Sequence, residues 1–534
     1  MKNSFSTNKK TILLLIILST FLYYIPGIFS PRDFWVEDEA RYAEVVRELI
    51  TYGDILVMRL NDHPYPDKPP IYFWLAALSS MLFGKITVFS FMLVTWLSTL
   101  GTVLTTYYFG QKLFDPKTAI YGVSILMSLF LFVACASIVR MDMLMTFFIT
   151  LALYQFWLGQ KDQKTIRYIL FWTFSALAVL TKGPLGIAFT LLPVVGFLII
   201  ERDWINLRKL IVNPGPFLFL AFVLGWLGLA WLVGYRDFVE NIVFKQIINR
   251  ATDSFIHKRP FYFYIVLFPL LILPWTAFLP RAIKTVFRDF QRSEIYFVVA
   301  WFVFGLLTIS VVSGKLFIYV LPILPPVALI LGKHFSEIFQ VKMRFTKGLR
   351  LESLLGIVLF FGIFFIAPMV ATKNMDTSGF SLIPLVVIST VFMLIGLYIF
   401  LTGRPVGIFL LLIVGMWVIS AYLFFWLAPS LDKVFSSRNA GNQIAQLIDK
   451  GDNVAIHKVR RGIFNFYAND IFHELTEVDA VSFVEESPRN ILLIRKQELA
   501  NLFTQSTFTS AIDTVAIYDI ANSTYYLVKK YVRN

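Results

Sequence analysis

The sequence predicts an α-helical polytopic membrane protein that ends in a small soluble α/β domain. Of its 534 residues 57% are hydrophobic and 17% aromatic, and only 15% are charged, whereas soluble domains carry about 25% charged residues. Apolar stretches of about 20 residues, the length that spans a bilayer, recur along most of the chain. After Ala428 the composition becomes that of a soluble domain. We therefore expect a transmembrane domain over residues 1–428 and a second domain over 429–534.

The apolar segments predict about thirteen transmembrane helices. They cover residues 11–29, 86–108, 118–137, 143–159, 165–181, 184–200, 216–234, 262–280, 294–312, 316–333, 352–371, 380–401 and 405–428. The first is interpreted as a retained anchor, because no small-x-small cleavage site follows it. Residues 71–84 are apolar but short, which favours an interfacial or re-entrant helix.

The lysines and arginines predict which side of the membrane each connection faces. Cytoplasmic connections are enriched in these residues, and alternate connections of this chain carry them in groups, at 112–117, 161–167, 202–209, 281–292 and 342–350. This pattern places the N-terminus in the cytoplasm and, with an odd number of spans, the C-terminal domain outside. Two long outer loops follow, 30–70 and 235–261, and the second is basic against the trend. We expect these two loops to form the active site.

Several function classes receive no support. The formal net charge of +14 is accounted for by basic cytoplasmic loops, so it does not predict a nucleic-acid partner. The single cysteine, Cys135, lies in an apolar segment and offers neither a disulfide nor a thiolate metal cluster. No glycine-rich phosphate loop is present, so no nucleotide is expected.

The C-terminal segment contains four runs typical of β-strands. They are NVAIHKV, NILLIRK, TVAIYDI and YYLVKK, all rich in β-branched or aromatic residues. These runs predict a small α/β domain on the outer face of the membrane.

The first outer loop begins with DEARYAEVVREL, which has the periodicity of an amphipathic helix from Asp38. Its apolar face is suited to lie on the membrane surface. Asp38 and Arg41 are three residues apart and can be neighbours, although Asp38 could equally cap the helix start. Four prolines follow and are expected to exclude regular strand pairing, which would hold Asp67 and Lys68 on a rigid segment. Alternatively, Lys68 is a lysine that extends to the lipid headgroups.

Four further charged sites lie at the expected outer ends of spans. Each alone could be an interfacial anchor, but ionisable residues at membrane depth are costly and usually functional, and all four fall on one side. A divalent metal ion bound by Asp67 and His257 is possible, although two ligands far apart in sequence are weak evidence. The four sites are Asp142 with Arg140, Lys182, His257 and Lys315.

This mixture of charges suits the transfer of a sugar from a lipid phosphate. Lysine and arginine bind the phosphate and stabilise the charge that develops as it leaves, while a carboxylate orients or deprotonates the attacking hydroxyl. An apolar cavity between spans would accommodate the lipid tail. The residues are therefore consistent with glycosyl transfer from a polyprenyl-phosphate donor.

The motifs also resemble a known family. D-E-x-R-Y-A-E, K-P-P, T-K-G-P and S-x-K followed by Y-x-L-P-x-x-P occur in this order within roughly residues 10–335. They resemble the lipid-carrier-dependent glycosyltransferases of the glycosyltransferase-C fold, most closely the aminoarabinose transferases that modify lipid A, which are relatives of the protein O-mannosyltransferases.

The resemblance implies a role for each matching residue. It implies catalytic roles for the acidic residues and contact with the donor phosphate for the basic residues and the tyrosine. In the metal pair, Asp67 stands where the aminoarabinose transferases usually carry glutamate. The implied catalytic residues are Asp38, Glu39 and Asp142; the donor-phosphate residues are Arg41, Lys68, Lys182, Lys315 and Tyr319; the metal ligands are Asp67 and His257.

The predicted function is transfer of a glycosyl group from undecaprenyl phosphate to an acceptor on the outer face of the inner membrane. Lipid A is the first candidate acceptor, and 4-amino-4-deoxy-L-arabinose is one candidate sugar. Transfer to a protein or to a lipid-linked glycan stays open, because the donor half of the site would look the same. A transporter or lipid flippase is the alternative class, and it predicts charges near the midplane and inverted repeats.

Overall fold

The protein is described from a computed structural model that covers residues 9–36, 38–243, 259–312, 314–341, 347–374, 381–505 and 511–531. By internal packing the chain divides into two compact units. Unit 1 comprises Met1–Ser30, Pro66–Tyr72 and Phe91–Leu427, and unit 2 comprises Pro31–Tyr65, Phe73–Ser90 and Ala428–Asn534.

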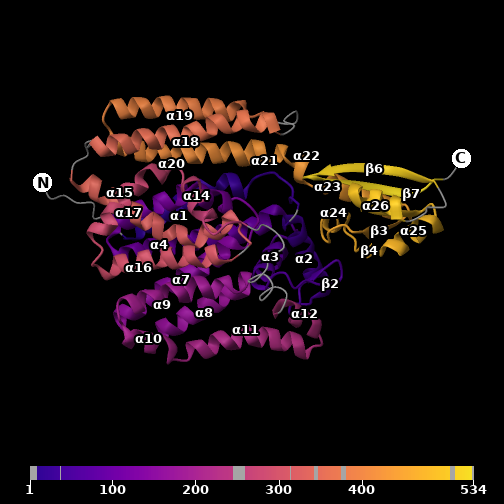
Figure 1. The fold of residues 1–534 in the computed structure, drawn as a ribbon, viewed down its shortest axis with the longest axis horizontal. Coiled ribbons are helices and arrows are strands. Elements are labelled where there is room, and N and C mark those ends of the chain that lie inside the picture. The colour runs from indigo at the N-terminus through magenta and orange to yellow at the C-terminus, as the bar shows by residue number, and fades with distance from the viewer. Residues whose placement is uncertain are drawn as a thin grey trace. The chain divides into compact units, whose positions relative to one another are not determined.

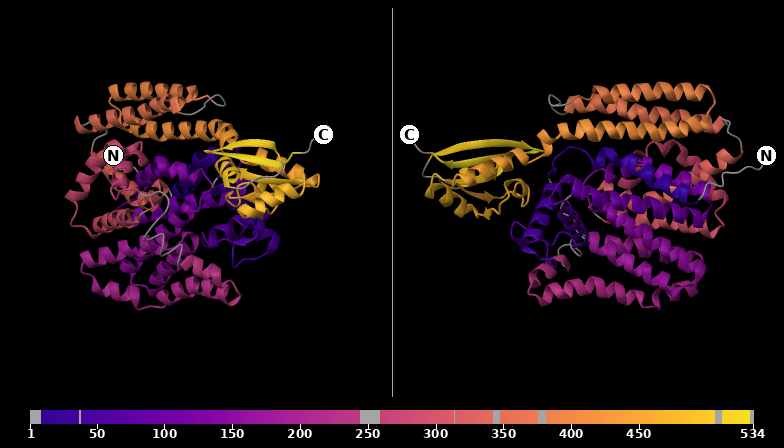
Figure 2. Two further views of the ribbon diagram at one scale, coloured as in Figure 1. Left: turned by 45° about the vertical axis from the view of Figure 1, so that its right-hand side comes forward. Right: turned by 180° about the vertical axis from the view of Figure 1, so that it is seen from behind.

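Unit 1 is a bundle of apolar helices (Figure 1). Figure 2 gives two further views of the same helices, in which α18, α19 and α20 lie side by side. The helices are α1 (Lys9–Ile28), α4 (Val88–Leu113), α5 (Pro116–Ser128), α6 (Phe130–Ala136), α7 (Asp142–Asp162), α8 (Thr165–Lys182), α9 (Leu185–Ile200), α10 (Trp204–Ile211), α11 (Gly215–Leu232), α12 (Arg236–Glu240), α14 (Phe263–Leu271), η2 (Trp275–Phe278), α15 (Leu279–Arg288), α16 (Ser293–Val311), η3 (Phe317–Ile323), α17 (Leu324–Val341), α18 (Lys347–Asn374), α19 (Ile383–Leu401), α20 (Pro405–Tyr422) and η4 (Leu423–Leu427).

Every apolar segment singled out in the sequence coincides with a helix or a helical pair. Within the described residues nine helices are long and apolar enough to cross a membrane, and the count rises to eleven if each of two bent pairs is one span. The bent pairs are α5 with α6, at 66°, and α14 with η2–α15, at 110°. The remaining two expected spans are α8 and the shorter α9. The expectation of a polytopic α-helical membrane protein is confirmed.

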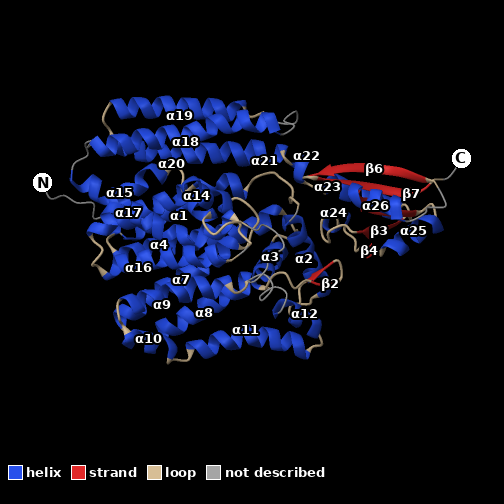
Figure 3. Ribbon diagram, in the orientation of Figure 1, coloured by secondary structure: helices blue, strands red, loops and turns tan. Residues whose placement is uncertain are grey.

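Unit 2 contains the C-terminal α/β domain (Figure 3). Its five-stranded sheet has the order β4-β3-β5-β7-β6, in which β4, β3 and β5 are parallel and β7 and β6 are antiparallel to their neighbours. All four predicted strands are present, as β3, β5, β6 and β7. The elements of this domain are α21 (Ala428–Ser430), α22 (Asp432–Phe435), α23 (Arg438–Asp449), β3 (Asn453–His457), α24 (Asn465–Ala468), β4 (His473–Glu474), α25 (Glu477–Glu486), β5 (Asn490–Arg495), α26 (Lys496–Gln505), β6 (Ile512–Ile520) and β7 (Ser523–Lys530).

Residues 31–65, which form most of the predicted first outer loop, pack with the C-terminal domain in unit 2. Their elements are α2 (Asp38–Tyr52), β1 (Arg59–Leu60) and β2 (His63–Pro64), and most of α3 (Ile71–Leu82) belongs to the same unit. Trp35 Nε1 donates a hydrogen bond to Asp432 Oδ1 over 2.7 Å, and Arg438 forms an ion pair with Asp33 at 2.9 Å. Packing therefore groups residues 31–65 with the C-terminal domain, whereas the composition predicts that the second domain contains only residues 429–534.

Two local expectations for this loop are wrong. The apolar face of α2 does not lie on a membrane surface: Tyr42 is 2% exposed and packs edge-on against Phe73, with the ring centroids 5.5 Å apart. The prolines also do not exclude strand pairing. β1 and β2 form a minimal antiparallel hairpin, because Asn61 and Asp62 both adopt positive φ (57° and 59°), as a tight type I′ turn requires.

Candidate active site

A helical hairpin brings Asp142 and Lys182 together in unit 1. Asp142 is the first residue of α7 and Lys182 the last residue of α8. Because the two helices are joined by a short turn and pack against each other, the start of one lies beside the end of the other. The Lys182 ammonium donates to Asp142 Oδ1, and their side chains are 7% and 1% exposed. Helix dipoles stabilise both charges, since the carboxylate is at an N-terminus and the ammonium at a C-terminus.

A second cation completes this cluster. Arg140 Nε lies 3.6 Å from Asp142 Oδ2, so two cations converge on one carboxylate. Asp142 Oδ2 is buried and accepts no hydrogen bond from the described residues. Buried carboxylate oxygens without a hydrogen bond are uncommon, which makes this cluster a candidate site.

The T-K-G-P motif is the turn that fixes Lys182. Gly183 ends α8 with φ +96°, a conformation that residues with a side chain rarely adopt, and Pro184 caps α9. The ammonium of Lys182 lies 4.8 Å from the centroid of the Tyr319 ring, which η3 supplies. Lys182 thus contacts both the predicted catalytic Asp142 and Tyr319, a second predicted donor-phosphate residue.

Lys315 is a second buried cation of unit 1, in the turn between α16 and η3. It is 4% exposed, and its ammonium donates to the carbonyl of Ser310 at 2.8 Å and to that of Val312. Tyr264 donates to the carbonyl of Leu316 at 3.1 Å and so fixes the end of this turn. Burial lowers the pKa of Lys315 because desolvation disfavours the charged form. An anion would compensate this charge.

The residues of the first motif lie in unit 2, at the start of α2. Asp38 is half-buried, and its carboxylate lies 3.9 Å from the guanidinium of Arg41, so the predicted neighbourhood of the two is confirmed. Glu39 is held in place by other groups: Arg32 donates to both carboxylate oxygens, at 2.5 and 2.9 Å, and the backbone N–H of Trp35 donates at 3.1 Å. This carboxylate therefore fixes the entry into α2, and its predicted catalytic role stays a prediction.

The predicted metal pair cannot be assembled from the described residues. Asp67 and Lys68 lie half-buried in the segment of unit 1 that precedes α3. His257 lies outside the described residues, and among those described no group of three or more His, Cys, Asp or Glu side chains could hold a metal ion. The divalent ion stays a prediction, which loss of activity on treatment with a chelator would support.

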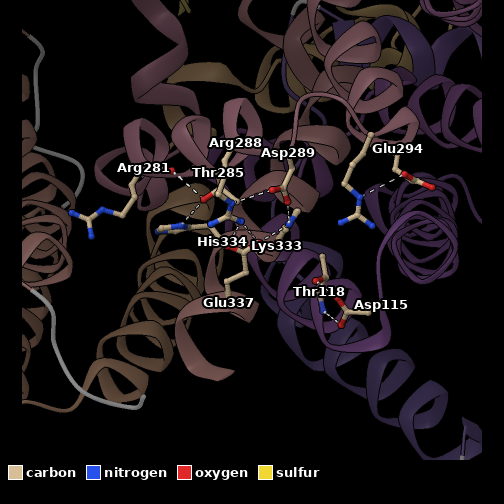
Figure 4. A network of polar contacts seen from close by, with 11 residues as sticks. Asp115, Thr118, Arg281, Thr285, Arg288, Asp289, Glu294, Lys333, His334 and Glu337 are labelled. Carbon is tan, nitrogen blue, oxygen red and sulfur yellow. Dashed lines mark hydrogen bonds and ion pairs between the residues drawn. The ribbon is translucent and has the colours of Figure 1, made fainter. Parts of the chain in front are cut away.

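Unit 1 holds another charged network, formed by α15, α17 and α18, and Figure 4 shows the residues that α15 and α17 contribute. Arg288 donates to both oxygens of Glu337, at 2.8 and 2.7 Å, and Lys333 bridges Asp289 at 2.7 Å and Glu337 at 2.5 Å. A second branch pairs Arg281 with Glu352 at 2.7 Å. Here three basic and three acidic residues are matched, so the network leaves no excess charge for a ligand.

Sequence reasoning missed the residues that hold the first motif in place. The sequence does not single out Arg32 or Asn61, because tertiary packing determines their partners. The turn of Asn61 did carry a signal, since two consecutive Asn/Asp residues between short apolar stretches favour a hairpin.

Three comparisons with known proteins relate this geometry to characterised chains. The family model for dolichyl-phosphate-mannose-protein mannosyltransferase matches residues 67–231. Curated relatives include the undecaprenyl phosphate-alpha-4-amino-4-deoxy-L-arabinose arabinosyl transferases of Shewanella sediminis, 30% identical over 66% of this chain and 65% of that protein, and of Edwardsiella ictaluri, 28% identical over 64% of this chain and 62% of that protein. The matched part is less than two thirds of the length of these relatives.

The solved structures agree over nearly the whole chain. ArnT from Cupriavidus metallidurans in the apo state has a TM-score of 0.79 at 18% identity, covering 97% of both chains. The same protein bound to undecaprenyl phosphate gives 0.76, covering 97% of this chain and 98% of that one. This protein is therefore a polytopic membrane protein with the glycosyltransferase-C fold. Its predicted resemblance to the lipid-carrier-dependent glycosyltransferases, with the aminoarabinose transferases among them, is confirmed.

Proposed function

We propose that this protein transfers a glycosyl group from an undecaprenyl-phosphate donor to an acceptor on the outer face of the inner membrane. The curated relatives favour 4-amino-4-deoxy-L-arabinose as the sugar, and lipid A is the first candidate acceptor. The observation that carries the proposal is the cluster of Arg140, Asp142, Lys182 and Tyr319, where two cations meet one buried carboxylate. Lys315 adds a further buried cation.

The cluster suits the charge changes of the reaction. The acceptor hydroxyl oxygen forms a bond to the anomeric carbon, and the bond from that carbon to the phosphate oxygen breaks. The phosphate leaves as a monoester and gains one negative charge, which Lys182 and Lys315 would stabilise more strongly in the transition state than in the ground state. The hydroxyl proton passes to a carboxylate, for which the family motif favours Asp38 and Asp142 is the second choice.

The proposal includes an orientation in the membrane. The basic connections favour a cytoplasmic N-terminus and an outer C-terminal domain. Single cysteines in a Cys135→Ser background test it, at Val478, which is 78% exposed in α25, and at Arg288, whose side chain is 61% exposed. An impermeant maleimide added to spheroplasts should label the first and spare the second. The reverse pattern would invert the orientation.

Purified protein and a labelled polyprenyl-phosphate sugar test the activity. Wild type should transfer the label to lipid A, and Asp38→Asn should lower the turnover number by about 100-fold or more, which is the usual contribution of a positioned acid or base. Unchanged activity in Asp38→Asn would remove Asp38 from the mechanism. If the protein uses no polyprenyl-phosphate donor, it is not a glycosyltransferase of this class, and the result would favour the transporter alternative.

Mass spectrometry of lipid A tests the acceptor separately. Cells that express the protein should contain lipid A with an added sugar mass that is absent from cells without it. An unchanged lipid A profile, together with label in protein or in a lipid-linked glycan, would move the proposal to those acceptors while keeping the donor chemistry.

A further inference from the structure

The C-terminal domain contacts α2, the helix that carries Asp38 and Arg41, at Gly462. This glycine has φ +80°, and a Cβ added to it would lie 2.5 Å from Leu60 Cδ1, 3.0 Å from Arg41 Cγ and 3.2 Å from Arg41 Cα. A Cβ atom here would force the buried Leu60 side chain to shift and would push Arg41, including its backbone, away by a few tenths of an ångström. The backbone at Gly462 thus packs directly on the first turn of α2.

A second contact holds the other end of α2. The backbone N–H of Asn61 donates to the carboxylate of Glu48 at 2.5 Å, and Asn465 Nδ2 donates to Asn61 Oδ1 at 2.7 Å. Asn61 Nδ2 in turn donates to the carbonyl of Phe472 at 2.9 Å. Asn61 and Asn465 are 1% and 2% exposed, so these hydrogen bonds are shielded from water and costly to leave unmade.

The two contacts are linked through one side chain. Asn465 Oδ1 accepts from the backbone N–H of Gly462 at 2.9 Å, so the amide of Asn465 connects the loop that packs on Arg41 to the hairpin that binds Glu48. Arg41 and Glu48 are seven residues apart, or about 10 Å along a helix. Fixing a helix at two points about 10 Å apart sets its position and its rotation. We call Gly462, Asn465 and Asn61 the α2 clamp.

We propose that Gly462 and Asn465 are positioning residues that hold Arg41 for the donor phosphate. The inference rests on the proposed function and assigns the C-terminal domain a part in it: this domain sets where the guanidinium of Arg41 lies. The predicted consequence is a defect in donor binding, because Arg41 is the group displaced.

Gly462→Ala tests the first contact, and Gly451→Ala is its matched control. Gly451 lies in the same domain with φ +89°, but a Cβ added there would meet only Arg489 Nη1, at 3.6 Å. The two variants therefore share the backbone strain and differ in the contact with α2. Gly462→Ala should raise the KM for the polyprenyl-phosphate donor about tenfold, the size expected for a weakened charged hydrogen bond. Gly451→Ala should leave KM unchanged.

Asn465→Ala tests the second contact, with Asn490→Ala as control. Asn490 is also a buried amide, 4% exposed, but among the described residues its side chain bonds only within the tail, to Asn453 and Phe483. Asn465→Ala should raise the donor KM in the same way, and the rise should vanish in an Arg41→Ala background. Equal KM values for the two asparagine variants would overturn the positioning role, as would a rise that persists without Arg41.

Hydrogen exchange of the full-length protein in detergent separates this inference from the proposed function, because it needs no substrate. The amides of residues 38–52 should exchange faster in Gly462→Ala than in Gly451→Ala. If they do not, the clamp is refuted whatever the enzyme does. If they do and the donor KM is unchanged in an active enzyme, Arg41 is not positioned by it. An inactive wild type would refute the proposed function alone.

Discussion

Two charged clusters of unit 1, the turn of Lys315 and the network of α15, α17 and α18, differ in charge balance. The buried ammonium of Lys315 donates only to backbone carbonyls among the described residues. In the network of α15, α17 and α18 three basic side chains face three acidic ones. The comparison teaches that the number of charges alone does not identify a candidate site, because the charges of a matched network already compensate one another.

The difference has an energetic basis. A matched network recovers through its ion pairs part of what desolvation costs, and removing one member leaves its partners uncompensated. A buried cation such as Lys315, whose described partners are only backbone carbonyls, is less well compensated, so its charge reduces the stability of the protein unless an anion binds. The two clusters should therefore respond to substitution in opposite ways.

The largest expected effect is the loss of activity in Lys315→Met. The structure gives this ammonium only backbone carbonyls as partners among the described residues. Methionine has a similar shape, so removing the charge should leave the melting temperature unchanged or higher while the turnover number falls by about 100-fold. Transfer of labelled sugar and thermal unfolding in detergent measure the two quantities. A large fall in melting temperature with normal turnover would make Lys315 a structural residue.

The converse is expected for Lys333→Met in the matched network. Asp289 and Glu337 would keep only Arg288, and the free energy of unfolding should fall by about 2 kcal/mol, less than for a fully buried pair because Glu337 is partly exposed. Donor KM and turnover should not change. Lys333→Arg should restore most of the stability. Lost turnover at normal stability would refute the distinction between the two clusters.

The sequence predicted the helices well because each apolar segment carries its own signal. All thirteen expected segments coincide with helices or helical pairs, and the four strand-like runs are strands. The packing of residues 31–65 with the tail was not predictable, because contacts such as Trp35 with Asp432 join residues 397 positions apart. The tail showed no motif that identified its partner.

The candidate site was predicted in its residue types and only partly in its geometry. Asp142 and Lys182 were both singled out, but their contact follows from the pairing of α7 with α8, which periodicity does not give. Glu39 was expected in catalysis from its place in the motif, and its pairing with Arg32 could not be inferred, since nothing local selects that arginine.

The smallest expected effect concerns Glu48 in α2, a helix in which acidic residues outnumber basic ones. Burial, with a smaller contribution from the negative charge of Glu44, raises the pKa of Glu48 to about 7. The neighbouring Arg47 donates its hydrogen bonds to Glu44. A raised pKa means that Glu48 stabilises the fold at low pH, below its unfolded value near 4.5, and that this contribution is lost as the pH rises through about 7. From pH 6.5 to 8.5 the free energy of unfolding should therefore fall by about 1 kcal/mol more in wild type than in Glu48→Gln. The exposed Glu486→Gln should follow wild type, and parallel curves for all three proteins would show that α2 tolerates its acid excess without taking up a proton.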